Sequence, residues 1–272
     1  MSEHESVVDL ELDRAHSSRI YDYFLGGKTN FLADRMAAGS VLGVFPSALI
    51  AARINREFMH RATRVLAASG MRQFLDIGTG IPTAPNLHDI AQGIAPDARV
   101  VYTDNDPIVL AHAAALLRST PEGRTAYVQA DVRDPEGILK APQLLDTLDL
   151  RRPVALSLNA LMHFVPDDGQ DRAHDIVERL KAALPSGSTL TMSHATEDFS
   201  PAVMDKIIKI YGEAGTRLQF RSRAAFQRFF DGWELLEPGV ALPHQWRPDH
   251  PEDATHVTDA EAACYAGVAR KP

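Results

Sequence analysis

Apolar positions divide the chain into a helical first quarter and a remainder in which strands and helices alternate. From Ser18 onward, apolar side chains recur every three or four residues, which is the spacing of amphipathic helices. Gly26 and Gly27 interrupt this pattern and predict a turn between two short helices. A third helix is expected over residues 46–69, ending at Gly70. The region 18–70 is therefore predicted to be a helical segment that precedes a sheet.

After Gly70 the pattern changes to short apolar runs separated by helical stretches. Strands are expected at 73–77, 99–103, 125–129, 153–159, 188–193, 233–237 and 262–269. Helices are expected at 83–93, 107–118, 135–146, 169–184 and 200–214. This alternation is typical of βαβ units and a parallel sheet.

The last two expected strands have no helical pattern between them, so they are predicted to form a hairpin with an antiparallel strand. The fold class expected is α/β: a Rossmann-like, seven-stranded, mostly parallel sheet with one antiparallel strand, helices on both faces and extra N-terminal helices. The irregular loop 240–259 is long, and such loops more often carry function than serve as linkers.

A length of 272 residues favours one core with an appended helical segment. Residues 1–17 are expected to be a flexible N-terminus, and 18–272 a single domain with the Rossmann-like core in 71–272. A net charge of -8 argues mildly against a large nucleic-acid or membrane surface. The polar N-terminus, the lack of a long apolar run and the single Cys264 predict a cytoplasmic protein. Cys264 itself is expected to be a small buried hydrophobe.

The first turn of the sheet carries the strongest chemical signal. Asp76, Gly78 and Gly80 follow one another at the end of the first expected strand. Dinucleotide-binding turns need a third glycine, and Thr83 stands at that position here. Asp76 would repel a pyrophosphate and suits a cationic ligand, such as one that carries an amino group and a sulfonium.

Acidic residues also end the next two strands. Asp104 can accept hydrogen bonds from both ribose hydroxyls, or it can cap the following helix. Asp106, just before Pro107, is better placed for capping. Asp131 can accept the exocyclic amine of adenine while Val132 packs against the ring; the alternative is a solvent-exposed turn acid.

The end of the fourth expected strand offers Asn159, whose amide can reach a ligand at the point where the strand order reverses. His163 is a candidate general base near a transfer site, although a histidine that fills the rim is an equally good interpretation. His194 is a weaker case of the same kind. The histidine spacings predict no metal site.

Five segments of the chain read as motifs: Arg19-Ile-Tyr-Asp-Tyr-Phe-Leu-Gly-Gly-Lys28, Phe74-Leu-Asp-Ile-Gly-Thr-Gly-Ile-Pro-Thr-Ala-Pro-Asn86, Tyr102-Thr-Asp-Asn-Asp-Pro107, His163-Phe-Val-Pro166 and Trp246-Arg-Pro-Asp249. Together they resemble class I S-adenosylmethionine-dependent methyltransferases, and more narrowly a bacterial methyltransferase-like family catalogued as domain of unknown function 574. The resemblance runs from about Ser18 to the C-terminus. One departure is Thr29, where the family pattern leads us to expect an acid.

The resemblance implies S-adenosyl-L-methionine as cofactor and a set of contacts to it. Those in the core are Asp76, Gly78, Thr79, Gly80, Asp104, Asn105, Asp131, Val132, Asn159 and Ala160. In the N-terminal motif, Arg19, Tyr23 and Gly26 are expected to fold over the cofactor as a lid. The resemblance gives no methyl acceptor.

The leading functional hypothesis is a methyltransferase for an unidentified small-molecule acceptor. Residues 18–69 and 200–259 would form the acceptor pocket, His163 would be the base, and Tyr21 or Tyr23 would orient the acceptor. The alternative is an S-adenosylmethionine-binding protein without methyl transfer, such as a sensor or partner module. A nicotinamide dehydrogenase is disfavoured by Asp76 and the missing third glycine. No nucleic-acid or membrane partner is expected, and the sequence gives no oligomeric state.

A run of arginines near phenylalanines allows a nucleic-acid surface as a weaker interpretation. Its members are Arg217, Arg221, Arg223 and Arg228, interleaved with Phe220, Phe226, Phe229 and Phe230. The favoured interpretation is a helix whose phenylalanines face the core and whose arginines face water.

Overall fold

The computed structural model describes residues 12–116 and 118–272. Residues 1–11, which make up most of the expected flexible N-terminus, lie outside the described part. The chain begins with three helices, α1 (Ser17–Phe24), α2 (Leu32–Val44) and α3 (Ala48–Ala68). The turn predicted at Gly26 and Gly27 separates α1 from α2, and α3 matches the third expected helix.

The seven expected strands are all present in one sheet. They are β1 (Gln73–Ile77), β2 (Arg99–Asp104), β3 (Arg124–Gln129), β4 (Ala155–Asn159), β5 (Thr189–Ala195), β6 (Glu234–Leu235) and β7 (Cys264–Arg270). Their order is β3-β2-β1-β4-β5-β7-β6. Strand β7 runs antiparallel to β5 and β6, while β1 to β5 are parallel to their neighbours. The predicted fold class is confirmed.

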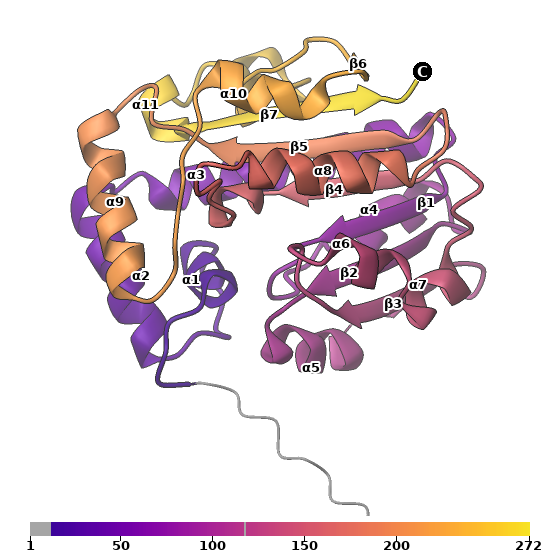
Figure 1. Cartoon of the computed structure of the whole chain (residues 1–272), viewed down its shortest axis with the longest axis horizontal. Coiled ribbons are helices and arrows are strands. Elements are labelled where there is room, and N and C mark those ends of the chain that lie inside the picture. The colour runs from indigo at the N-terminus through magenta and orange to yellow at the C-terminus, as the bar shows by residue number, and fades with distance from the viewer. Residues whose placement is uncertain (1–11, 117) are drawn as a thin grey trace, which may run out of the picture.

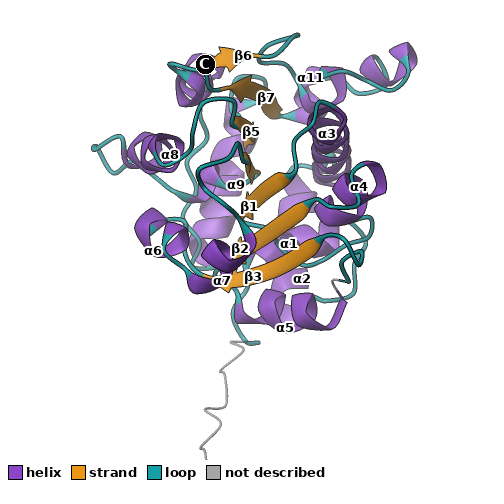
Figure 2. Cartoon of the chain, turned by 90° about the vertical axis from the view of Figure 1, so that its right-hand side faces the viewer, coloured by secondary structure: helices purple, strands orange, loops and turns teal. Residues whose placement is uncertain are grey.

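Helices cover both faces of the sheet (Figure 2). One face carries α3 and α4 (Leu87–Ile94), with α5 (Pro107–Leu116) at its edge near β3. The other carries α6 (Pro135–Leu139), α7 (Pro142–Thr147), α8 (Arg172–Ala182) and α10 (Arg223–Gln227). The short helix α11 (Asp259–Ala262) leads into β7.

The two apolar layers follow from the side-chain alternation of the strands. In β1, Leu75 and Ile77 join a cluster that includes Ile138 of α6 and Val177 of α8. Phe74 faces the opposite layer, where α3 and α4 pack. All five residues of β1 are buried, as expected for the central strand of a sheet covered on both sides.

Two expected helices differ from the prediction, and proline explains both differences. The helix expected at 83–93 begins only at Leu87, after a turn that contains Pro82 and Pro85. The helix expected at 135–146 is divided into α6 and α7 at Ala141, whose backbone is extended. The residue before a proline avoids the helical conformation, and Pro142 follows Ala141 directly.

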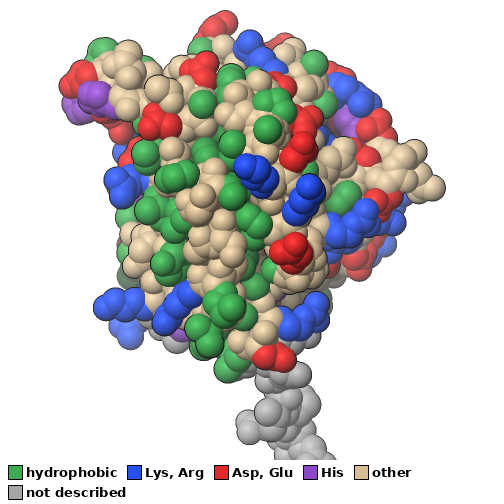
Figure 3. Space-filling view, turned by 90° about the vertical axis from the view of Figure 1, so that its left-hand side faces the viewer, with side chains coloured by type: hydrophobic (Ala, Val, Ile, Leu, Met, Phe, Trp, Pro, Cys, Tyr) green, Lys and Arg blue, Asp and Glu red, His purple; other side chains and the backbone are tan. Residues whose placement is uncertain are grey.

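Helices α1, α2 and α9 (Pro201–Glu213) lie beyond the carboxyl ends of the parallel strands (Figure 1). We call these three helices the cap. They share their own apolar cluster, built on Ile20, Val41, Met204 and Ile207. Figure 3 looks onto the outer side of the cap, where hydrophobic side chains form a broad area; Leu32 and Met36 of α2 are exposed. Within the described ranges no single helix is long and apolar enough to cross a bilayer, although α2 and α3 together, bent by 104°, reach that length and composition.

Candidate functional site

A cavity of about 660 Å³ lies between the carboxyl ends of β1 to β4 and the cap. The structure brings most predicted site residues to its wall: Arg19, Asp76, Gly78, Thr79, Gly80, Asp104, Asn105, Asp131, Val132, Asn159, Ala160 and His163. Tyr23 and Gly26 are not among its lining residues; they line a separate hollow with Arg53 and His60.

The turn after β1 is shaped by its two glycines. Gly78 and Gly80 have positive φ angles of 76° and 69°, a region that glycine enters without strain. The amide of Gly78 donates to the carbonyl of Thr103, and the amide of Gly80 donates to Asp104 Oδ2 at 2.8 Å. The turn is thereby fixed to the end of β2, which leaves its backbone facing the cavity.

Replacing these glycines by alanine should have unequal effects. A Cβ at Gly78 would lie 2.6 Å from Leu161 Cδ1, whereas a Cβ at Gly80 would meet nothing within 4 Å. We expect Gly80→Ala to reduce the free energy of unfolding by about 1 kcal/mol through backbone strain alone, and Gly78→Ala by about 2–3 kcal/mol. Urea unfolding of both variants measures this difference. Equal losses would mean that Leu161 moves aside freely.

Asp76 is an unusually buried acid. Burial raises the pKa of its carboxyl to about 6, although hydrogen bonds from Ser157 and Thr79 and the positive charge of Arg56 oppose the rise. Arg56 comes from α3, and its guanidinium donates to the carbonyl oxygens of Thr83 and Pro85. The floor of the cavity therefore holds a carboxylate that a cationic guest would stabilise in its ionised form.

Two acids at the end of β2 have different partners. Asp104 is 7% exposed and accepts the amides of Gly80 and Asp106. Asp106 accepts the amide of Ile108 at 2.9 Å, which confirms that it caps α5. Its other oxygen binds Arg19 Nε at 3.0 Å and the Ser18 hydroxyl at 2.9 Å.

Arg19 joins the cap to the core as well as lining the cavity. It is buried against Asp106, so it ties α1 of the cap to the start of α5 in the core. The rest of the N-terminal motif forms a turn: Asn30 donates to Asp22 at 2.7 Å and to the carbonyl of Gly27. Gly27 is required there, since a Cβ would lie 1.9 Å from Asp22 Oδ1.

The ends of β3 and β4 complete the polar half of the cavity. Asp131 receives Asn105 Nδ2 at 3.3 Å and pairs with Arg133, and it is partly exposed. Val132 beside it is buried. Asn159 donates to the Ser157 hydroxyl, and its amide oxygen is buried without a partner among the described residues. Ala160 has a positive φ of 50°, a strained backbone of the kind found at ligand sites.

His163 lines the cavity, but its surroundings do not suit a general base. Burial, with a contribution from nearby Arg221, lowers its pKa to about 3. Its Nδ1 accepts the amide of Ala195 at 3.5 Å. The ring packs against Phe164 and His194. This geometry favours the alternative interpretation, a neutral histidine that fills the wall.

His194 has a structural role. Its Nδ1 donates to the carbonyl of Ala195 at 2.7 Å, and its Nε2 accepts from Arg221 at 2.9 Å. Burial holds its pKa well below the usual value, so the ring is neutral. Cys264 is buried as expected, and burial raises the pKa of its thiol to about 12.

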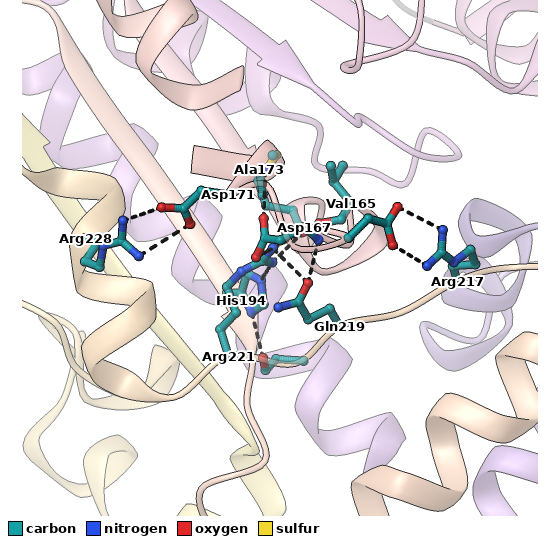
Figure 4. Close-up of polar contacts among 12 residues, drawn as sticks. Val165, Asp167, Asp171, Ala173, His194, Arg217, Gln219, Arg221 and Arg228 are labelled. Carbon is teal, nitrogen blue, oxygen red and sulfur yellow. Dashed lines mark hydrogen bonds and ion pairs between the residues drawn. The ribbon is translucent and has the colours of Figure 1, made fainter. Parts of the chain in front are cut away.

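The arginine-rich segment is joined to the loop after β4 by a row of ion pairs (Figure 4). Arg217 pairs with Asp168, Arg221 with Asp167, and Arg228 with Asp171. Arg221 is only 6% exposed and also donates to the carbonyl oxygens of Met162 and Val165. The prediction that all these arginines face water is therefore wrong for Arg221.

The four phenylalanines of this segment are buried, as predicted. They do not share one helix: Phe220 precedes α10, Phe226 lies in it, and Phe229 and Phe230 follow in a 3-10 turn. Phe226, Phe229 and Phe230 pack in one core cluster, while Phe220 joins the apolar cluster of the cap.

The cavity residues that the sequence did not single out include Asn55, Arg56 and Tyr211. Asn55 donates to the hydroxyl of Tyr21, which itself donates to a carbonyl of α3. The signal that could have identified Asn55 is a polar residue on the apolar side of the helix expected at 46–69. The loop 240–259, in contrast, contributes no lining residue among those described; it packs on α3, where Arg61 donates to the carbonyl of Trp246.

The strand order, the glycine turn and the acids at adjacent strand ends define a Rossmann-like domain built for a nucleoside-bearing ligand at its switch point. The chain belongs to the S-adenosyl methyltransferase family, whose profile matches residues 3–272. The predicted family and its cofactor class are thus confirmed. The acceptor is not identified by the family.

Two solved structures are similar over nearly the whole chain. One is a DUF574 family protein from Streptomyces avermitilis MA-4680, with 50% identity, a TM-score of 0.93, and coverage of 97% of this chain and 100% of that one. The other, from Thermobifida fusca YX and provisionally assigned as a methyltransferase, has 39% identity, a TM-score of 0.88 and coverage of 96% and 97%.

A curated relative from Mycobacterium tuberculosis H37Rv, provisionally assigned as an S-adenosyl-L-methionine-dependent methyltransferase, is 27% identical over 183 residues. The match covers 61% of this chain and 50% of the relative. The chain thus spans about half the length of the curated relatives it matches.

Proposed function

We propose that this protein transfers a methyl group from S-adenosyl-L-methionine to a small molecule. The observation that carries the proposal is one cavity with two unlike halves. Carboxylates at adjacent strand ends line one half, and the apolar cap lines the other. A cofactor with a cationic end would fit the first half and leave the second for an acceptor.

The residues present fit such a cofactor. Burial raises the pKa of Asp76 despite the positive charge of Arg56, and a cationic guest would stabilise its ionised carboxylate. Asp104 would hold the ribose hydroxyls, Asp131 and Val132 the adenine, and Asn159 the amino-acid end, where its buried amide oxygen lacks a partner within the described chain. Asn105 and the backbone of Gly78, Thr79, Gly80 and Ala160 would complete the contacts, and Arg19 would close the cavity.

When bound, the sulfonium supplies a methyl group that leaves sulfur without its bonding electrons and is taken up by a lone pair of the acceptor. The protein then has to bind the acceptor, align it and exclude water. The Ala195 amide at Nδ1 and the low pKa of His163 leave this residue as a wall of the cavity. The acceptor therefore needs a nucleophile that is reactive without His163.

The pKa of Asp76 predicts how cofactor binding depends on pH. A cationic guest favours the ionised carboxylate, so affinity should fall as protons bind to Asp76 below about pH 6. We expect S-adenosylmethionine to bind about 10-fold more weakly at pH 5 than at pH 7. Calorimetry at both pH values measures this, and Asp76→Asn should remove the dependence. A pH-independent affinity in the unmodified protein would contradict the role given to Asp76.

The raised pKa of Asp76 has the opposite effect on the stability of the protein without cofactor. Because the folded state binds the Asp76 proton more tightly than the unfolded state, stability falls as pH rises from about 4 to 6. Asp76→Asn should therefore stabilise the empty protein at pH 7, by at most roughly 3 kcal/mol, while it weakens cofactor binding.

The proposal is tested in two stages. Calorimetric titration with S-adenosylmethionine and mass spectrometry of copurified small molecules test the cofactor site. Incubation with a panel of small-molecule nucleophiles, with detection of S-adenosylhomocysteine and methylated product, tests transfer. Failure to bind the cofactor rejects the proposal. Binding without transfer over a broad panel favours the second candidate, a cofactor-binding sensor. The poor suitability of His163 as a general base is the observation that favours this candidate.

A further inference from the structure

We infer that the acceptor is an uncharged, ring-bearing molecule that places one polar group against the hydroxyl of Tyr211. This inference rests on the proposed function, since it assigns the half of the cavity that the cofactor would leave free. It follows from the lining of that half, from where its charges lie, and from one hydroxyl without a partner.

The cap half of the cavity is lined almost entirely by neutral side chains. The residues that both line the cavity and belong to the apolar cluster of the cap are Ala15, Phe24, Val41, Phe45, Ala48, Phe164, Ala195, Met204, Ile207, Tyr211, Leu218, Phe220 and Ala263. Five of them are aromatic. Aromatic walls favour a flat ring, which can stack or meet them edge to face.

Charged lining residues at this end lie at the rim. Arg14, Asp168, Arg172 and Arg217 are exposed. Arg217 pairs with Asp168 at 3.0 Å, so these two charges already satisfy each other. A charged group placed among the apolar side chains, rather than at this exposed rim, would lose its hydration, and such burial is costly.

Tyr211 supplies the polar feature of the apolar half. It comes from α9, is 8% exposed and lines the cavity. Its ring packs against that of Phe164, with the two ring centroids 6.0 Å apart. Its hydroxyl has no hydrogen-bond partner among the described residues, and burial alone raises its pKa. A neutral phenol that can donate and accept is therefore available to a polar group of the acceptor.

The test measures binding rather than turnover. Protein saturated with S-adenosylhomocysteine is dialysed to equilibrium against four probes of one ring size: 2-naphthol, naphthalene, 2-naphthoate and 2-naphthylmethylammonium. We expect 2-naphthol to bind at least about 100-fold more tightly than either charged probe, and several-fold more tightly than naphthalene. Either charged probe binding as tightly as 2-naphthol overturns the inference, and so does undetectable binding of 2-naphthol at millimolar concentration.

Tyr211→Phe tests the hydroxyl itself. This variant keeps the ring and should weaken 2-naphthol about 3- to 10-fold while leaving naphthalene unchanged. Tyr265→Phe is the matched control, because that hydroxyl donates to Asp198 at 3.0 Å and Tyr265 does not line the cavity. Equal effects of Tyr211→Phe on both probes would mean a structural role and would reject the polar contact.

Failure of this inference can be distinguished from failure of the proposed function. Calorimetry with S-adenosylhomocysteine precedes the dialysis, so absence of a cofactor site is detected first and independently. If the cofactor compound binds and the charged probes are preferred, the proposed function stands and the acceptor class assigned here is wrong.

Discussion

Asp104→Ala should abolish most of the affinity for S-adenosylmethionine. The carboxylate would accept both ribose hydroxyls, and a hydrogen bond to a charged group contributes about 1.5–3 kcal/mol. Asp104 also fixes the glycine turn, since it accepts the amide of Gly80 at 2.8 Å. Losing both roles should weaken binding roughly 1000-fold, as measured by calorimetry.

Asp134→Ala is the control for Asp104→Ala. Asp134 likewise accepts a backbone amide at the start of a helix, from Gly137 at 3.0 Å, but it does not line the cavity. Its loss should reduce stability by about 1 kcal/mol and leave cofactor affinity unchanged. The site assignment would be untenable if Asp104→Ala, folded and monodisperse, bound the cofactor with unchanged affinity.

Arg221→Ala should be the most destabilising single substitution among those considered. The guanidinium is buried and donates to Met162, Val165 and Asp167. Removal deletes one donor from each of these acceptors and from the neutral ring of His194. Deleting one member of a buried ion pair reduces the free energy of unfolding by about 3–5 kcal/mol, a large part of the usual total of about 5–15 kcal/mol.

Arg217→Ala provides the contrast for Arg221→Ala within the same row of ion pairs. Arg217 is 68% exposed and pairs with the exposed Asp168, so its loss should change stability by less than about 1 kcal/mol. Chemical unfolding of both variants in one buffer compares them. If the two losses were similar, burial would not be what makes Arg221 important.

The sheet could be predicted because its signal is local. Each of the first five strands is a short apolar run that ends in a polar turn, and the helices between them force a parallel arrangement. The site residues at the strand ends followed directly, since parallel strands bring Asp76, Asp104 and Asn159 to one edge. Their contacts with a cofactor remain predictions.

The features of the site that could not be predicted from the sequence depend on contacts between distant segments. Arg221 meets Asp167 across 54 residues, and Arg19 meets Asp106 across 87 residues. Nothing in the spacing near either arginine distinguishes it from a solvent-exposed neighbour. Tyr211 presented the same difficulty: its position in an apolar helix pattern predicts a core residue, while the cavity beside it comes from α1, α2 and β7.

The buried carboxylate of Asp76 has a consequence for how long each molecule survives in a cell. An empty chain carries a charge that burial disfavours, whereas a ligand that binds only the folded form shifts the balance away from unfolding. Chains without a guest would open more often and reach proteases sooner. Abundance of this protein should therefore follow the supply of its ligand.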